Sequence, residues 1–145
     1  MSSQRNVNPF SILILFISIL AIILEIIGPF AGLYLGGGYY NRYSCLDCEY
    51  STVGDYIFQI LSIIIFIIIV IIALNDLLPK KFITRDLTKI GFLLSLITII
   101  FAVAGLSSFG IAYSEYDWWP EMGFYAIIIG GILNTIFFYL KQKNA

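Results

Sequence analysis

The chain has 145 residues, of which 60% are hydrophobic and 12% are charged. Soluble domains carry about 25% charged residues, so this composition excludes an ordinary soluble domain and predicts a single integral membrane domain. Its eight basic side chains, in a chain with a net charge of −1, are too few for a nucleic-acid surface. Histidine is absent, and no phosphate-binding loop, dinucleotide fingerprint or nucleophile elbow occurs. We therefore expect no enzymatic activity, no cofactor and no metal site.

The first apolar run covers residues 11–36 and is interrupted by one ionisable side chain, Glu25. A helix of this length would rise about 39 Å, enough to cross a hydrocarbon core of about 30 Å, with Glu25 near its middle. An acid inside a spanning helix is a functional-site candidate by default. In one interpretation it is a neutral carboxyl that hydrogen-bonds to Ser62, Ser107, Ser108 or the backbone carbonyl beside it, because desolvation favours the neutral acid. In the other it couples to protons or cations.

A proline and three glycines follow this acid. Pro29 cannot donate to the carbonyl of Glu25, which predicts a kink in the helix. Gly28, Gly32 and Gly36 recur every four residues, a spacing that lets a second membrane helix approach closely. The first span is therefore expected to combine a buried acid, a kink and a helix-packing seam.

Three further apolar runs predict an all-α bundle of four transmembrane helices. The third span carries small residues around Gly105, and in the fourth Ala126, Gly130 and Asn134 recur every four residues. These stripes predict close helix packing, with Asn134 as an interhelical hydrogen-bonding group. The predicted spans after the first are residues 56–78, 87–112 and 122–140.

Cys45 and Cys48 form a C-x-x-C sequence in the loop after the first span. We expect a local disulfide, since the outer compartment permits one. Two thiols are too few for a closed zinc site, which takes four ligands, unless subunits share the site. A redox motif of the thioredoxin type is disfavoured because no βαβ pattern surrounds it.

The charges predict the topology. Seven of the eight basic residues lie beside the N-terminus, the middle loop and the C-terminus, and Arg42 is the exception. This bias predicts a multi-pass protein of the cell membrane with both termini in the cytoplasm. The abundance of isoleucine favours a prokaryotic or archaeal source.

The two outer loops are rich in acidic and aromatic residues. They predict a small extracellular cap from loops 1 and 3, which is either a thick aromatic belt at the interface or a surface for a partner. The cap residues that we expect are Tyr39, Tyr40, Tyr116, Asp117, Trp118 and Trp119.

Two resemblances follow from these features. The cytoplasmic termini, the cysteine pair in the first outer loop and the short aromatic second loop resemble claudin-like, peripheral-myelin-protein-like and tetraspanin-like proteins. The sequence from Trp119 to Tyr125, followed by Gly130 and Gly131, is similar to the claudin-type entry into the fourth helix. This resemblance implies the four-helix architecture.

The second resemblance is to small multidrug resistance transporters. The sequence from Ala21 to Gly28 is similar to their first helix, in which a glutamate precedes two aliphatic residues and a glycine. The resemblance implies that Glu25 would bind protons and a cationic substrate in turn.

The expected function is lateral assembly in the membrane. In this hypothesis the chain is a non-enzymatic protein that contacts lipids and forms a homo-oligomer, such as a closed ring, or serves as an accessory subunit of a larger membrane complex. The alternative is a small proton-coupled transporter or channel that uses Glu25.

Overall fold

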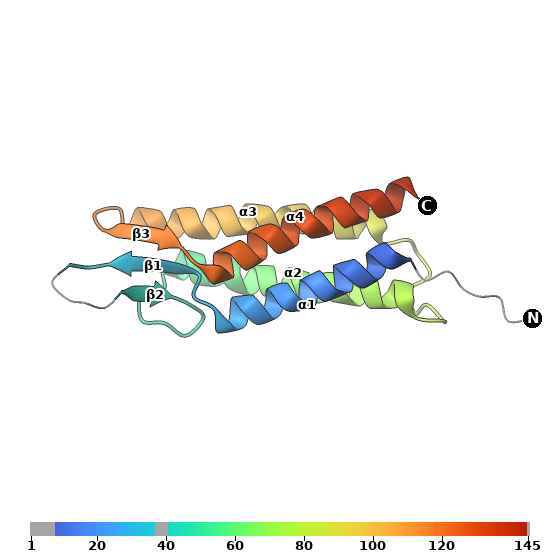
Figure 1. The fold of residues 1–145 in the computed structure, drawn as a ribbon, viewed down its shortest axis with the longest axis horizontal. Helices are drawn as coiled ribbons and strands as arrows, with labels where there is room; N and C mark the ends of the chain where they lie inside the picture. The colour runs from blue at the N-terminus through green and yellow to red at the C-terminus, as the bar shows by residue number, and fades with distance from the viewer. Residues whose placement is uncertain (1–7, 37–40, 145) are drawn as a thin grey trace, which may run out of the picture.

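The computed structural model describes residues 8–36 and 41–144, which form four long helices and three short strands (Figure 1). The helices are α1 (Pro9–Ile27), α2 (Val53–Leu77), α3 (Thr88–Ala112) and α4 (Met122–Lys143). The strands are β1 (Ala31–Tyr34), β2 (Arg42–Ser44) and β3 (Asp117–Pro120).

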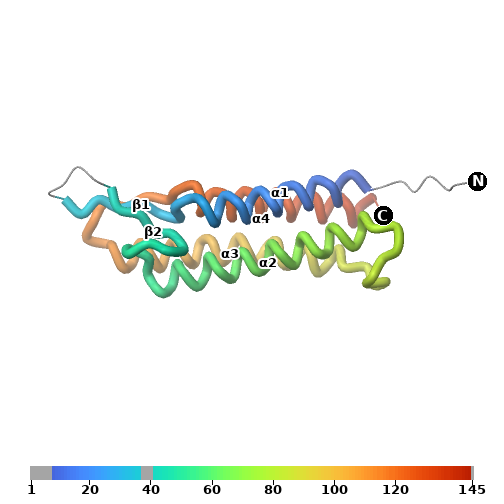
Figure 2. The backbone as a smooth tube through the Cα atoms, turned by 90° about the horizontal axis from the view of Figure 1, so that it is seen from below, coloured from blue at the N-terminus to red at the C-terminus, as the bar shows by residue number. Residues whose placement is uncertain are grey.

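The four helices form an antiparallel bundle. Helix α1 packs against α2 and α4, and α3 packs against the same two helices. Figure 2 shows the resulting two layers, one of α1 with α4 and one of α2 with α3. The strands lie at one end of the bundle, here called the sheet end, and the C-terminus lies at the opposite, terminal end (Figure 1). All four helices are long and apolar enough to cross a membrane, as the sequence predicted.

The first helix ends nine residues earlier than predicted. Helix α1 stops at Ile27, and Gly28 follows as its C-cap, with its N–H bonded to the carbonyl of Leu24 at 2.9 Å. The residue before a proline is disfavoured in the helical conformation, so Pro29 ends the helix instead of kinking it. Glu25 consequently lies near the sheet end of α1, not at its middle.

The predicted glycine seam is also wrong. Gly28 caps α1, Gly32 lies in β1, and Gly36 has a positive φ of 74° beyond the strand. These three glycines therefore share no helical face. A Cβ atom at Gly32 would lie 2.5 Å from the ring of Trp119, so glycine is required there for a cross-strand contact.

The strands form an antiparallel sheet in the order β2-β1-β3, so the all-α prediction was incomplete. In the register of β1 with β3, Gly32 faces Trp119 and Leu33 faces Trp118. The pairing continues beyond the strands, where Glu121 N–H donates to the carbonyl of Phe30 at 3.0 Å. The sheet thus joins the segment after α1 to the segment before α4.

Small residues hold the helices close together. A Cβ atom at Gly105 of α3 would lie 3.1 Å from the ring of Phe30, and one at Gly91 only 2.3 Å from the ring of Phe138. Phe30 and Phe138 are themselves fully buried. The small residues of α3 therefore pack against aromatic rings inside the bundle, where close contact maximises dispersion.

Candidate functional site

A group of buried polar residues lies under the sheet, at the start of α2. Thr52 and Asp55 form a capping box: Asp55 N–H bonds to the Thr52 hydroxyl at 3.2 Å, and Thr52 N–H bonds to Asp55 Oδ1 at 2.6 Å. Asp55 is fully buried and also accepts a short hydrogen bond from the hydroxyl of Ser44 in β2. The acid therefore fixes both the start of α2 and the position of β2.

The polar contacts continue in both directions from Asp55. One turn along α2, Gln59 Nε2 donates to Asp55 Oδ2 at 3.4 Å. Toward the surface, the hydroxyls of Ser44 and Ser51 lie 3.2 Å apart, and Ser51 is half-buried. The Ser51 hydroxyl donates to the carbonyl of Cys45 and the Ser44 hydroxyl donates to Asp55, so the hydrogen-bonded group runs from Ser44 through Asp55 to Gln59, and all three are fully buried.

Glu25 is 1% exposed, and neither of its carboxyl oxygens has a partner among the residues that the structure describes. The expected serine partners bond elsewhere. Ser62 donates to the carbonyl of Phe58 and Ser107 to that of Val103, which are ordinary helix back-bonds. The predicted hydrogen bond between Glu25 and these serines is therefore wrong within the described residues.

Ser108 does not reach Glu25 either. A Cβ atom at Gly54 would lie 1.9 Å from the Ser108 hydroxyl oxygen, so this side chain packs against the first turn of α2. Gly54 and Ser108 form a close contact between α2 and α3 at the sheet end.

The contacts of Gly130 give the position of Glu25 along the axis of the bundle. A Cβ atom at Gly130 of α4 would lie 3.0 Å from Ala21 Cβ and 3.1 Å from the ring of Phe66, so these residues form one layer. Glu25 follows Ala21 by one helical turn toward the sheet end, and Ser62 precedes Phe66 by one turn in the same direction. Glu25 and Ser62 therefore occupy the next layer of the bundle.

Asn134 forms the interhelical hydrogen bond expected of it. Its Nδ2 donates to the hydroxyl of Ser18 in α1 at 2.8 Å, and both side chains are fully buried. This pair lies one turn nearer the terminal end than the layer of Ala21 and Gly130. Asn134 and Glu25 thus lie on opposite sides of an apolar layer.

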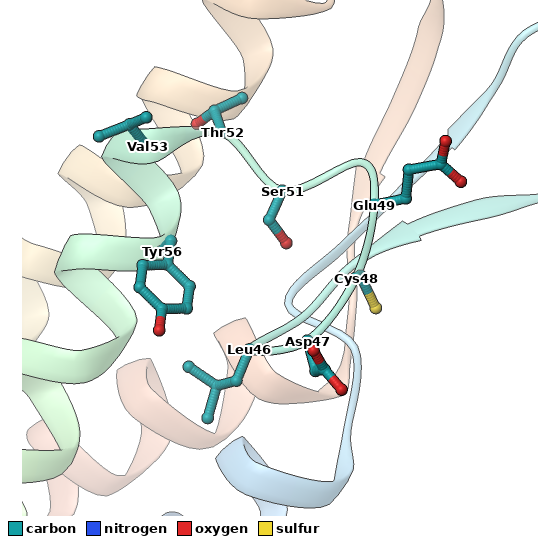
Figure 3. Close-up of a pocket in the computed structure, with 8 residues that line it drawn as sticks. All are labelled: Leu46, Asp47, Cys48, Glu49, Ser51, Thr52, Val53 and Tyr56. Carbon is teal, nitrogen blue, oxygen red and sulfur yellow. The ribbon is translucent and has the colours of Figure 1, made fainter.

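Cys45 and Cys48 are joined by a disulfide in the loop between β2 and α2. The same loop borders an open pocket of about 520 Å³, here called the acidic pocket. Figure 3 shows the Ser51 side chain pointing into the space between the loop and α2. The acidic pocket is lined by Leu46, Asp47, Cys48, Glu49, Ser51, Thr52, Val53 and Tyr56.

The aromatic residues of the sheet end form a packed cluster. Trp118 packs at the end of α3, where a Cβ atom at Gly110 would lie 2.4 Å from its ring. Trp119 crosses β1, and its Nε1 donates to Glu121 Oε1 at 2.5 Å. Tyr116 and Asp117 are exposed beside them. Of the aromatic residues expected in the cap, Tyr39 and Tyr40 lie outside the described residues.

Tyr113 ties this cluster to the polar group at the start of α2. Its hydroxyl donates to the carbonyl of Tyr50 at 3.0 Å. Burial, together with electrostatic interaction with the nearby Asp55 and Tyr50, raises the pKa of Tyr113 above its ordinary value. The tyrosine therefore stays neutral and keeps its hydroxyl as a donor.

An apolar groove of about 190 Å³ opens between α1 and α4. Ala126 and Gly130, which the sequence placed on a packing face, lie in its wall, and the side chains of Tyr125 and Ile129 are about half exposed at its edge. The groove is lined by Ile17, Leu20, Ala21, Leu24, Met122, Tyr125, Ala126, Ile129, Gly130 and Leu133.

The terminal end carries an ion pair that the sequence analysis did not identify. Lys141 of α4 forms a short contact with Asp76 of α2, and both side chains are largely buried. Lys81 lies 3.5 Å from the other carboxylate oxygen of Asp76. Residues 65 positions apart cannot be paired from a sequence without knowing which helices are neighbours.

No family model, curated protein or solved structure matches this chain. The claudin-like and transporter-like resemblances therefore stay predictions. Among the described residues, no three His, Cys, Asp or Glu side chains lie close enough to hold a metal ion.

The main residues that the sequence analysis missed are Asp55 and Gln59. A signal for them was present, because Thr52-x-x-Asp55 is a capping-box sequence and places the acid on the first turn of a helix. Gln59 and Ser62 follow Asp55 at four and seven residues, which is the spacing of one helix face.

Proposed function

We propose that the chain is a non-enzymatic membrane protein that acts by lateral association in the bilayer. The supporting observation is the apolar groove between α1 and α4, whose wall contains Ala21, Ala126 and Gly130. Small residues let a second helix approach a membrane helix closely, and dispersion then stabilises the contact. The occupant that we propose is a helix of a second copy of this chain.

The matching surface lies on α2. Four large aliphatic side chains recur every three or four residues on its outward face, each 36–47% exposed. They form a continuous ridge, here called the α2 ridge, which complements a groove lined by small residues. The α2 ridge consists of Leu61, Ile64, Ile68 and Ile71.

The groove and the α2 ridge belong to different layers of the bundle (Figure 2). A contact between two different surfaces is heterologous, and such contacts close into a ring when the rotation between subunits permits it. We therefore propose a cyclic homo-oligomer. In this arrangement the sheet ends of all subunits would face the same side of the membrane.

The charge bias supports an orientation with both termini in the cytoplasm. The basic residues of the terminal end include Lys80, Lys81, Lys89 and Lys143, and basic loops are retained on the cytoplasmic side. The sheet end with its acidic pocket would then face outward, where a disulfide is stable.

Cysteine crosslinking tests the assembly. In a background without Cys45 and Cys48, Ile64→Cys on the α2 ridge and Ile129→Cys at the groove should form intersubunit disulfides in native membranes. The matched control replaces Ile129→Cys by Leu93→Cys, which is exposed on α3 and lies outside both surfaces. We expect a ladder of oligomers for the first pair only.

Native mass spectrometry in mild detergent provides the second measurement. A stable multimer of this chain alone supports the proposal. A monomer in every detergent, without crosslinked species in native membranes, would refute self-assembly. A complex containing only different proteins would also refute it and would identify an accessory subunit.

A further inference from the structure

A polar pocket of about 460 Å³, here called the basic pocket, lies at the terminal end, where all four helices begin or end (Figure 1). Its wall contains Asn8 before α1, Asp76 in the last turn of α2, Lys89 in the first turn of α3 and Lys141 in the last turn of α4. For a bundle that spans a bilayer, this is the depth of the lipid headgroups, because the apolar helices end here.

The wall of the basic pocket carries more positive than negative charge. It contains three lysines, Lys81, Lys89 and Lys141, and two aspartates, Asp76 and Asp86, which leaves one net positive charge. Around the pocket, the described residues of the terminal end add three basic side chains and no further acid. These three are Lys80, Arg85 and Lys143. The pocket therefore attracts an anion.

Two of the lysines share one carboxylate. Lys141 contacts one oxygen of Asp76, and the Lys81 ammonium nitrogen lies 3.5 Å from the other oxygen. One carboxylate balances only one of these two charges. The side chains of Lys141 and Asp76 are 10% and 13% exposed, and a charge with so little access to water is costly without a partner of opposite sign. Each ammonium group has three N–H donors, so both lysines can also bind a second anion.

Lys89 extends the basic pocket to the lipid-facing side of α3. It forms no ion pair with any residue that the structure describes. Leu93, Ile100 and Val103 follow it at 4, 11 and 14 residues, which places them on the same helical face, and they are 51–62% exposed. This face is about 21 Å long, more than half of a hydrocarbon core of about 30 Å. A lipid whose acyl chains lie along this face has its phosphate at the depth of Lys89.

We propose that the basic pocket binds the phosphate group of an anionic phospholipid in the leaflet at the terminal end. The ammonium groups of Lys81, Lys89 and Lys141 hold the phosphate oxygens, because lysine binds phosphate as a compact point charge. A phosphodiester carries one negative charge, which balances the net charge of the pocket wall. A choline headgroup would add a positive charge beside the lysines and is therefore disfavoured. The proposal assumes that the chain spans the bilayer, but it does not depend on the proposed assembly.

Native mass spectrometry of the full chain in mild detergent tests this proposal. The protein is titrated with phosphatidylglycerol, with phosphatidylcholine and with inorganic phosphate. Each bound lipid appears as a mass shift, so its Kd is obtained for a monomer and for any oligomer separately. We expect phosphatidylglycerol to bind more tightly than phosphatidylcholine by at least about fivefold, which is the contribution of one charge at a lipid headgroup. Inorganic phosphate should displace it no better than chloride of the same ionic strength.

Substitutions that change one charge locate the site. Lys81→Gln and Lys89→Gln should each weaken the binding of phosphatidylglycerol about fivefold. Asp86→Asn removes a negative charge from the same wall, so it should strengthen this binding. The matched control is Lys143→Gln, which removes the same charge as Lys89→Gln at an exposed position outside the pocket wall and should leave the affinity unchanged. All four positions are exposed, and each variant is compared after its circular dichroism and thermal transition show a folded protein.

Three results would overturn the proposal. Equal affinity for phosphatidylglycerol and phosphatidylcholine would show that the headgroup charge is not recognised. Equal weakening in Lys89→Gln and Lys143→Gln, or no strengthening in Asp86→Asn, would show a general attraction to basic residues instead of a site in this pocket. Displacement by inorganic phosphate well below the effect of chloride would identify a soluble phosphate compound as the ligand. A monomeric protein that binds the lipid as expected would refute the assembly and leave this proposal intact.

Discussion

Gly32→Ala tests most clearly whether Gly32 lies in a helix-packing seam, as the sequence predicted, or in strand β1, as the structure shows. In a helix seam, alanine is a small residue and is tolerated. In the structure, a Cβ atom at this position would lie 2.5–2.7 Å from three atoms of the Trp119 ring. The ring must move away, and its hydrogen bond to Glu121 is then lost.

The expected cost has two parts. Overpacking of this kind costs about 1–3 kcal/mol. The loss of a hydrogen bond to a charged group adds about 1.5–3 kcal/mol where the ring leaves its place completely. Because the ring is only half-buried and can relax, we expect a total cost near the lower end of this sum, about 2.5 kcal/mol.

Tryptophan fluorescence and thermal unfolding measure this effect, since Trp118 and Trp119 are the only two tryptophans. We expect red-shifted emission and a lower Tm for Gly32→Ala. The control is Gly36→Ala. A Cβ atom there would meet nothing within 4 Å, but φ is 74°, a backbone conformation that disfavours alanine. This variant should therefore lower the Tm without changing the tryptophan emission. Unchanged emission and Tm for Gly32→Ala would refute the strand and its contact with Trp119.

Three further predictions concern the loops and the terminal end. Cys45 and Cys48 should resist alkylation until a reductant is added, and free thiols in native protein would contradict the disulfide. Replacing both by serine should lower the free energy of unfolding by about 2 kcal/mol or less, because the disulfide closes a very short loop. Lys141→Met should lower the free energy of unfolding by about 2–4 kcal/mol in denaturant titrations, because the largely buried Asp76 then has only the more distant Lys81 as a partner. The control Lys143→Met, at an exposed position, should change the free energy of unfolding little. The hydrogen bonds from Thr88 hold the pKa of Asp86 below its ordinary value of 3.8. The ionised Asp86 therefore stabilises the fold above this ordinary pKa, and this stabilisation is lost as the pH falls through the lower pKa of the folded state. Wild-type protein should therefore lose more stability between neutral pH and pH 3 than Asp86→Asn does, and parallel pH profiles would contradict this reading.

The number and position of the helices could be predicted because each is a long apolar run bounded by polar or proline-containing segments. The bounds of α2, α3 and α4 agree with the predicted spans to within three residues. The end of α1 could not be predicted in this way. The run continues through residues 28–36 without a polar residue, so hydrophobicity does not separate the helix from β1.

The strands are a second case. Ala31–Tyr34 contains no β-branched residue, and its partner β3 begins 83 residues after β1 ends. Pairing over such a distance depends on how the helices bring the two segments together, which the local sequence does not encode. The contact of Gly32 with Trp119 provides the physical reason for this glycine, but only after the pairing is known.

For the candidate site, the sequence identified the residue but not its surroundings. Glu25 could be predicted as buried because a lone acid in an apolar helix has few alternatives. Which polar residues of α2 face the bundle interior depends on the rotation of α2 about its axis, and the structure buries Gln59 and Ser62. Of the polar contacts at the start of α2, only the pairing of Thr52 with Asp55 has a local sequence signature.

Thiol labelling of intact cells tests most directly whether this chain spans the membrane four times with the sheet end outside. Single cysteines are placed at Ser3, Asn144 and Glu115 in a background without the native pair, and a membrane-impermeant reagent is added before or after lysis. We expect Glu115→Cys to be labelled in intact cells and the other two cysteines to be labelled only after lysis. Labelling of Ser3→Cys or Asn144→Cys without lysis, or protection of Glu115→Cys, would contradict it.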